Sequence, residues 1–163
     1  QILMHEGVTL AIAEGAESAA AATDFALRHM IRKVAALGVV AVGVAEDVIV
    51  AEWQGLDKGQ AVVAKDGVAV AQEDRRGTAA MLNDLAVSGH HSEAIGGVLV
   101  KVTKPAQDRR VDLPAIGCET IEQAKAAGLA GIAVSAGGAI LLDREAIVAA
   151  ADQAGLFVIG IDA

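Results

Sequence analysis

The chain has 163 residues, of which 54% are hydrophobic and 2% aromatic, and its formal net charge at pH 7 is −8. This length and apolar content are enough for one compact domain with an aliphatic core. A nucleic-acid partner is disfavoured, because proteins of that class need a basic face and aromatic platforms for the bases.

The sequence favours a cytoplasmic location. Cys118 is the only cysteine, which excludes an intrachain disulfide and fits a reducing compartment. No apolar run reaches the roughly 18 to 20 residues of a membrane span. The first residues lack the basic region and cleavage site of a secretory signal. We therefore expect a protein that is soluble or bound at a membrane surface.

Apolar runs alternate with Ala-rich segments along the first half of the chain. The pattern predicts a strand over residues 8–13, a helix over 16–37, and strands over 39–44 and 48–53. Residues 60–71 form two apolar runs joined at Asp66-Gly67, which is a strong hairpin signal. This antiparallel pair implies a sheet that is not entirely parallel.

The second half alternates regularly between helix and strand signals. Thr78 is predicted to cap a helix that ends at Ala86, and Thr120 and Asp143 are predicted to cap two more. The later helices are expected over residues 121–127 and 144–154, and the strands over 97–102, 129–134, 139–142 and 156–161. The chain is thus predicted to be an α/β protein with a single domain, in which helices flank a mixed, partly parallel sheet.

Other glycine-rich or polar features have simpler explanations than a site. Gly96-Gly97 and Gly137-Gly138 lack the remaining residues of a phosphate-binding fingerprint. His90-His91 has no further His or Cys at a metal-ligand spacing, so a surface loop is the better interpretation. Cys118 is interpreted as a small core residue.

The segment from Lys101 to Gly117 contains four cations, two carboxylates and both prolines of the chain. The cations are Lys101, Lys104, Arg109 and Arg110. Such cations can neutralise a diphosphate, and Asp112, which precedes the rigid Leu113-Pro114, can hold a divalent cation or activate water. The same residues are compatible with a solvated charged rim and with a carboxylate that caps turn amides. The residues alone leave these alternatives open.

Many short motifs of the chain occur in the same order in one enzyme family. In the polar segment they are Lys101, Lys104-Pro105, Gln107, Arg110, Asp112-Leu113-Pro114 and Ile116-Gly117. Elsewhere they are residues 56–63, 77–78, 80–82, 127–132, 142–145, 150–152 and 155–157. These motifs resemble the C-terminal domain of UDP-2,3-diacylglucosamine pyrophosphatases of the non-metallophosphoesterase type, and the resemblance covers residues 55–163.

The resemblance implies a cytoplasmic enzyme of lipid A biosynthesis that is peripheral to the inner membrane and compatible with a homo-oligomer. Such an enzyme hydrolyses UDP-2,3-diacylglucosamine to 2,3-diacylglucosamine 1-phosphate and UMP with a divalent metal, magnesium or manganese. Asp112 matches the family's essential aspartate, which makes it the expected catalytic and metal-binding residue. The residues expected to bind the substrate are Lys101, Lys104, Gln107, Arg110 and Thr78.

Two features of the chain depart from the family pattern. Arg76-Gly77-Thr78-Ala79 stands where the family has Glu-Gly-Thr-Asp, so two carboxylates are missing. Residues 1–54 do not match the family's N-terminal Rossmann-like domain; they are an unassigned α/β segment, either a linker or a divergent half-domain. A second hypothesis is therefore a catalytically silent relative that binds a nucleotide-sugar or an anionic lipid, or that needs a missing N-terminal domain.

Overall fold

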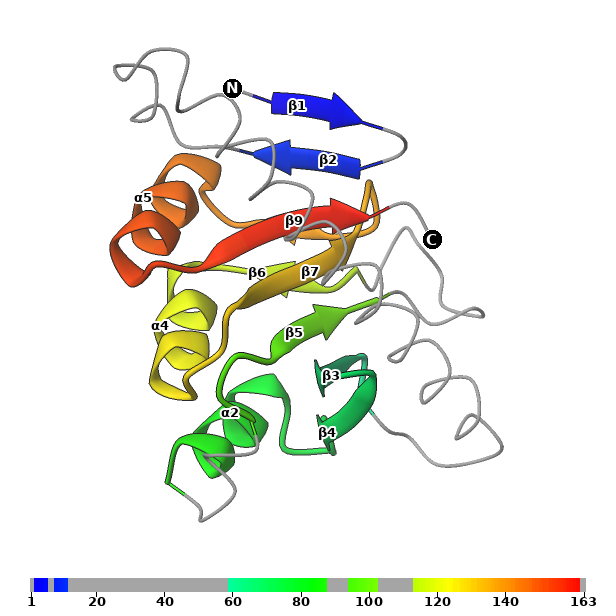
Figure 1. Cartoon of the computed structure of the whole chain (residues 1–163), viewed down its shortest axis with the longest axis vertical. Helices are drawn as coiled ribbons and strands as arrows, with labels where there is room; N and C mark the ends of the chain where they lie inside the picture. The colour runs from blue at the N-terminus through cyan, green and yellow to red at the C-terminus, as the bar shows by residue number, and fades with distance from the viewer. Residues whose placement is uncertain (1, 6–7, 12–58, 88–93, 103–112, 162–163) are drawn as a thin grey trace.

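Seven described strands form one sheet, and three described helices lie against it (Figure 1). The computed structural model describes residues 2–5, 8–11, 59–87, 94–102 and 113–161. In chain order the elements are β1 (Ile2–His5), β2 (Val8–Ala11), β3 (Ala61–Lys65), β4 (Val68–Gln72), α2 (Thr78–Val87), β5 (Val98–Lys101), β6 (Ala115–Ile116), α4 (Cys118–Ala126), β7 (Gly131–Ser135), β8 (Ile140–Leu141), α5 (Arg144–Ala154) and β9 (Phe157–Ile161). The α/β class predicted from the sequence is confirmed.

The large sheet is mixed, with the strand order β1-β2-β9-β7-β5-β3-β4. Its centre is parallel, because Leu99 of β5 pairs with Ile132 of β7, which pairs with Val158 of β9. The remaining strands join antiparallel on both sides. The predicted mixed, partly parallel sheet is therefore confirmed. β6 and β8 form a separate parallel pair that links the two crossover connections.

The hairpin predicted at Asp66-Gly67 joins β3 to β4. Asp66 has a φ of 51° and Gly67 a φ of 80°. Two successive positive φ values define the tight turn that matches the twist of paired strands, and Asp-Gly is a preferred sequence for it. The hairpin brings the end of β4 back to the start of β3, where the N–H of Glu73 donates to the carbonyl of Ala61 at 2.8 Å.

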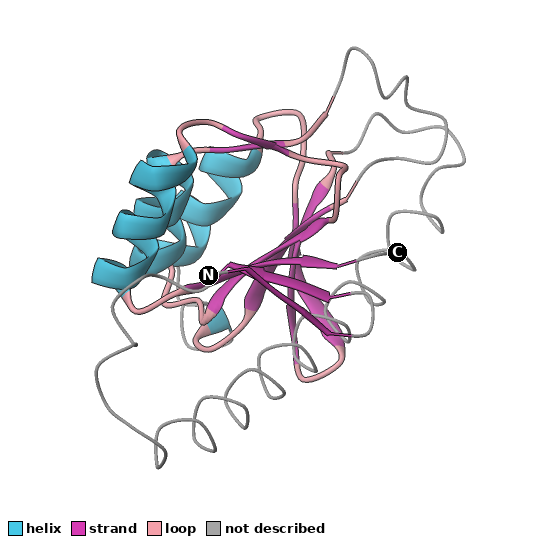
Figure 2. Ribbon diagram, turned by 90° about the horizontal axis from the view of Figure 1, so that it is seen from above, coloured by secondary structure: helices cyan, strands magenta, loops and turns pink. Residues whose placement is uncertain are grey.

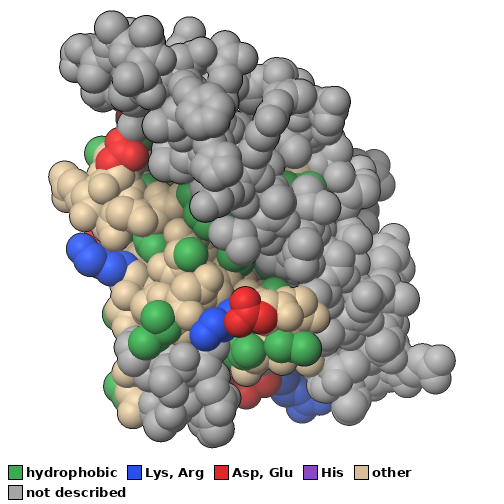
Figure 3. Space-filling view, viewed as in Figure 1, with side chains coloured by type: hydrophobic (Ala, Val, Ile, Leu, Met, Phe, Trp, Pro, Cys, Tyr) green, Lys and Arg blue, Asp and Glu red, His purple; other side chains and the backbone are tan. Residues whose placement is uncertain are grey.

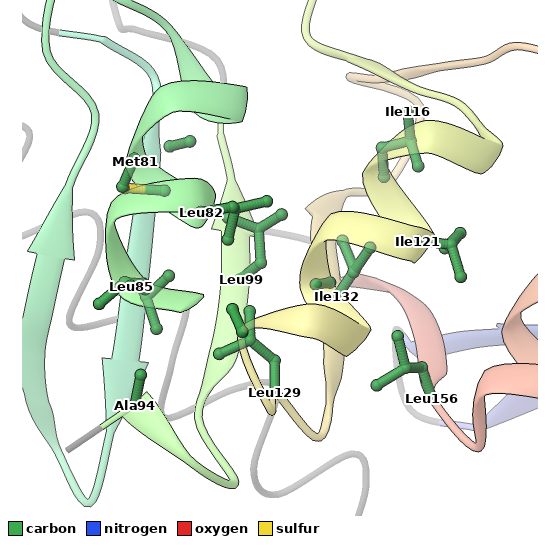
Figure 4. Close-up of a cluster of buried hydrophobic side chains, with 14 of the residues drawn as sticks. Met81, Leu82, Leu85, Ala94, Leu99, Ile116, Ile121, Leu129, Ile132 and Leu156 are labelled. Carbon is green, nitrogen blue, oxygen red and sulfur yellow. The ribbon is translucent and has the colours of Figure 1, made fainter. Parts of the chain in front are cut away.

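The described helices cover one face of the sheet (Figure 2). Leu82 and Leu85 of α2, Ile121 of α4, and Leu99 and Ile132 of the sheet belong to one aliphatic cluster (Figure 4). Each side chain of this kind stabilises the fold by roughly 1.5–3 kcal/mol when it is fully buried. The aliphatic core expected from the low aromatic content is thus present in the described part of the chain.

The opposite face of the sheet is buried as well. Val62, Val100 and Ala133 lie on it, and none of them has an accessible side chain. Strands that are buried on both faces are apolar at every position instead of alternating between apolar and polar residues. This explains the apolar runs of β3, β5 and β7, each of which has a single polar residue, at its last position.

Two predicted helix caps are displaced. Gly117, and not Thr120, is the N-cap of α4. Thr120 is the third residue of that helix, and its hydroxyl accepts the N–H of Gly117 at 3.4 Å. Thr78 is the first residue of α2 rather than its cap, because the carbonyl of Gly77 already accepts an N–H from the first turn. In both places the true cap is a glycine without a side-chain acceptor.

α5 begins and ends as the sequence predicts. The carboxylate of Asp143 accepts the N–H of Ala146 at 3.1 Å, and Gly155 ends the helix with a φ of 71°. Positive φ at this position costs glycine nothing, which is why glycine is common after the last helical turn. None of the helices in the described ranges is long and apolar enough to cross a membrane.

The helix predicted over residues 16–37, the strands over 39–44 and 48–53 and the His90-His91 loop lie outside the described residues. The boundary at residues 54 and 55 also lies outside them and stays a prediction. Near the N-terminus, β2 agrees with the strand predicted from residue 8, whereas β1 was not predicted. A run of four residues is too short for a clear alternating pattern.

Candidate functional site

One edge of the sheet collects the carboxyl ends of the parallel strands β5, β7 and β9, whose arrows point the same way in Figure 1. β3 runs antiparallel to β5, so its first residue, Ala61, pairs with Lys101, the last residue of β5. Glu73 follows β4 and reaches the same edge through its hydrogen bond to Ala61. Ligands of open α/β sheets bind outside the carboxyl ends of the strands. This carboxyl edge is therefore the candidate site.

Glu73 is fixed by three hydrogen bonds to its carboxylate. Oε2 accepts the backbone N–H groups of Gln60 and Ala61 at 2.7 and 3.0 Å. Oε1 accepts the hydroxyl of Thr78 at 2.9 Å. The side chain passes so close to Gly59 that a β-carbon on that residue would overlap it. Glu73 therefore joins the start of β3 to the start of α2.

Lys101 is a buried cation with only 8% of its surface exposed. Its side chain lies on the helix-covered face, as that of Leu99 does two positions earlier. Nζ donates to the carbonyl oxygen of Ala115 at 3.0 Å. Burial lowers the pKa of Lys101 because it disfavours the charged form, and the negative charge of Glu73 opposes this shift. A buried ammonium at this edge is well suited to bind an anion.

The structure brings two of the predicted substrate-binding residues, Thr78 and Lys101, to the surroundings of Glu73. Thr78 is hydrogen-bonded to Glu73, and Lys101 pairs in the sheet with Ala61, whose carbonyl accepts the N–H of Glu73. We call Glu73, Thr78 and Lys101 the edge cluster. The sequence analysis missed Glu73. Its signal was a carboxylate directly after an apolar run and five residues before Thr78.

The other predicted site residues lie outside the described part of the chain. They are Lys104, Gln107, Arg110 and Asp112, all within residues 103–112. Both flanks of this segment are at the carboxyl edge, because the N–H of Val102 donates to the carbonyl of Gln60 at 3.2 Å and Ala115 accepts the bond from Lys101. The roles of the four residues stay predictions.

In the described ranges, no group of three or more His, Cys, Asp or Glu side chains is placed to hold a metal ion. Both oxygens of Glu73 already accept N–H or O–H donors, so this carboxylate is engaged as a hydrogen-bond acceptor. The predicted metal ligand, Asp112, is not among the described residues. The edge cluster therefore does not constitute a metal site by itself.

Arg76 and Ala79, which stand where the family has Glu and Asp, are both exposed. Arg76 is bound by two exposed carboxylates, Asp74 at 2.9 Å and Asp84 at 2.7 Å. The hydrogen bond from Arg76 lowers the pKa of Asp74, and the bonds to both carboxylates raise the pKa of Arg76. Ala79 is exposed in the first turn of α2. The cation at position 76 is thus neutralised locally.

Charged side chains of both signs are scattered over the described surface seen in Figure 3, without a basic face. The exposed apolar residues include three consecutive ones at β8, Ile140, Leu141 and Leu142. Among the described charged residues, only Lys101 is buried.

Comparison with known proteins identifies one family. The family model described as "LpxI C-terminal domain" matches residues 35–159, a range that contains the whole edge cluster. The curated protein UDP-2,3-diacylglucosamine pyrophosphatase LpxI of Caulobacter vibrioides is 48% identical to the chain over 112 residues. The aligned region is 66% of this chain and 40% of the relative, so the chain spans less than half of that protein's length. The resemblance found in the sequence is confirmed.

Proposed function

Because the chain belongs to the LpxI C-terminal domain family, we propose that it hydrolyses the diphosphate of UDP-2,3-diacylglucosamine, giving 2,3-diacylglucosamine 1-phosphate and UMP in lipid A biosynthesis. The name of the Caulobacter relative supports this substrate and this reaction. In the structure, the supporting observation is the buried ammonium of Lys101 at the carboxyl edge, directly before the segment that contains Asp112.

Diphosphate hydrolysis needs fixed positive charge. Cleavage of the bridge increases the negative charge on the two phosphates, and cations that are already in place stabilise the transition state without reorganising. An ammonium carries three N–H donors. Lys101 gives one to Ala115, which leaves two that no described group accepts. We assign these donors to the diphosphate oxygens, with further contacts from Lys104, Gln107 and Arg110.

Asp112 is the proposed catalytic residue and the proposed ligand of a divalent ion, magnesium or manganese. The support is its match to the family's aspartate, in a segment whose flanks both lie at the carboxyl edge. Such an ion supplies positive charge beside the diphosphate. Lys101 acts independently of it, by holding an oxygen of the substrate at the end of β5.

Release of UMP from UDP-2,3-diacylglucosamine tests this proposal. We expect release by the chain with magnesium or manganese, no release after chelation with EDTA, and a loss of about a hundredfold or more in Asp112→Ala and Lys101→Met. Lys125→Met, which changes an exposed lysine of α4, is the matched control and should keep full activity. No release by the unmodified chain contradicts the enzyme proposal. Full release by Asp112→Ala contradicts only the role of that residue.

A catalytically silent relative is the second candidate function. It is favoured by exposed Ala79 and by Arg76, which stand where the family has carboxylates. Such a protein would bind a nucleotide-sugar or an anionic lipid, or would need an N-terminal domain for catalysis. Binding of UDP without release of UMP, measured by calorimetry and product analysis, supports this candidate. Metal-dependent UMP release excludes it.

We also propose a cytoplasmic location peripheral to the inner membrane. A diacylated substrate and the exposed apolar residues Ile140–Leu142 support contact with a lipid surface. Co-sedimentation with phospholipid vesicles, reduced in Leu141→Ser, is the expected result; no co-sedimentation contradicts it. Self-association into a homo-oligomer is a further proposal, and a monomeric mass by light scattering contradicts that part.

A further inference from the structure

The hydroxyl of Thr78 has a fixed hydrogen-bond polarity. A threonine hydroxyl has one hydrogen to donate and lone pairs to accept with, whereas a carboxylate only accepts. At 2.9 Å from Oε1 of Glu73, the hydroxyl must therefore be the donor. Its hydrogen points at Glu73, and only its lone pairs remain for another group.

This polarity is imposed by the sheet. Oε2 of Glu73 is held by the N–H groups of Ala61, the first residue of β3, and of Gln60, the residue before it. The rest of the side chain fills the space left by the missing side chain of Gly59. If Glu73 turned away from Thr78, the N–H groups of Gln60 and Ala61 would lose their acceptor, which is unfavourable for donors that are not exposed to water.

The edge cluster consequently has an accepting end and a donating end. Phosphate oxygens accept hydrogen bonds and carry negative charge, so they suit the ammonium of Lys101. They do not suit Thr78, whose hydrogen is already used and whose partner is a carboxylate of the same sign. A neutral O–H or N–H donor fits the lone pairs of Thr78 without either conflict.

We propose that Thr78 accepts a hydrogen bond from a neutral donor of the uridine part of the ligand, while the diphosphate lies towards Lys101. Glu73 is the positioning residue that sets this preference. The shared chemistry is a donor group, either a ribose hydroxyl or the uracil N–H. This inference rests on the proposed function, which supplies the uridine diphosphate.

Replacement of Glu73 by Gln reverses the polarity of Thr78 with almost no change in shape. The amide oxygen can still accept the N–H groups of Gln60 and Ala61, and the amide NH₂ then faces Thr78 as a donor. The hydroxyl of Thr78 must accept this bond, and its hydrogen becomes available. Thr78→Val removes the hydroxyl and nearly keeps the side-chain shape, whereas Thr78→Ser restores the hydroxyl.

Calorimetric titration of the full chain with UDP and with inorganic pyrophosphate tests the inference. We expect Thr78→Val to weaken UDP binding about tenfold, the usual effect of one lost hydrogen bond, and to leave pyrophosphate binding unchanged. Glu73→Gln leaves Thr78 one lone pair and frees its hydrogen, so it should weaken UDP binding less than Thr78→Val does and make pyrophosphate binding tighter. Thr78→Ser should bind both ligands like the unmodified chain. Both affinities are measured in the same preparation, so an unfolded fraction affects both and does not change their ratio. Circular dichroism shows whether such a fraction is present.

Analogues of UDP identify the donor. The analogue 2′-deoxy-UDP lacks one ribose hydroxyl, and 3-methyl-UDP lacks the uracil N–H. Thr78→Val should not reduce the affinity further for the analogue that lacks the group in contact with Thr78. An equal loss of UDP and pyrophosphate in Thr78→Val, or an unchanged affinity for UDP, overturns this inference alone. Absence of UDP binding by the unmodified chain overturns the proposed function, and the ligand assigned to Thr78 with it.

Discussion

The side chain of Glu73 lies where a β-carbon on Gly59 would be. The two residues are also joined through the backbone, because the N–H of Gly59 donates to the carbonyl of Glu73 at 3.1 Å. Only glycine at position 59 permits both contacts. The absence of one side chain thus allows the carboxylate to hold Thr78 and to lie near Lys101.

Gly59→Ala is expected to lower the free energy of unfolding by about 1–3 kcal/mol, because Glu73 must leave the N–H groups of Gln60 and Ala61. In the background of Glu73→Ala the same substitution should cost much less, since nothing remains to overlap. Urea denaturation of the four proteins measures this difference. Equal costs in both backgrounds would contradict the contact.

Lys101→Met is expected to be at least as stable as the unmodified chain at pH 7, although it loses diphosphate binding. Methionine has a similar volume and no charge to desolvate. The pKa of Lys101 is lower in the folded chain than its ordinary value of 10.5. Between these two values the unfolded chain therefore binds more protons than the folded chain. Stability should therefore rise with pH through this window in the unmodified chain, and rise less in Lys101→Met.

Urea midpoints of both proteins across this pH range provide the measurement. Lys125→Met is the matched control, because Lys125 is exposed and its replacement should leave the pH dependence unchanged. A loss of more than about 2 kcal/mol in Lys101→Met at pH 7 would show that the ammonium stabilises the fold on balance.

Ala79→Asp is expected to stabilise the chain by about 0.3–1 kcal/mol, because the first turn of α2 contains no acidic residue and its N-terminus carries partial positive charge. Ala79→Asn, which has no charge, is the control. Thermal unfolding compares the two. The same variant restores one family carboxylate, so we also expect it to increase UMP release. Equal stability of the two variants would exclude a contribution from the charge.

Asp143→Ala is expected to cost about 1–2 kcal/mol, because it removes the acceptor for the N–H of Ala146 and places alanine at a φ of 61°. Asp143→Asn should cost less, since Asn also caps helices and tolerates this conformation. Asp152→Ala, an exposed change in the same helix, should be close to neutral. Urea denaturation ranks the three, and an equal cost of Ala and Asn would contradict the capping role.

Local signals predicted most of the helices and strands from residue 60 onward. Asp66-Gly67, Asp143 and Gly155 each act through their own backbone conformation and their nearest neighbours, so a short stretch of sequence contains the information. A local signal was also the source of the wrong cap predicted at Thr120. Its hydroxyl does bond near the start of α4, but from the third helical position and not from the cap.

The edge cluster was only partly predictable. Lys101 and Thr78 were identified because they belong to motifs, whereas Glu73 acquires its role from residues 12 and 13 positions away, Ala61 and Gln60. That proximity depends on the register of β3 and β4 and on the space at Gly59. Neither can be seen in a local pattern.

The hydrogen bond from Lys101 to Ala115 joins residues 14 positions apart and has a consequence for the segment between them. Closing a loop costs chain entropy that increases only slowly with its length. Here the two flanks are already fixed at the carboxyl edge, by the bond from Lys101 to Ala115 and by the bond from Val102 to Gln60. Folding of the described sheet therefore sets the distance between the two ends of the segment without any contribution from a ligand.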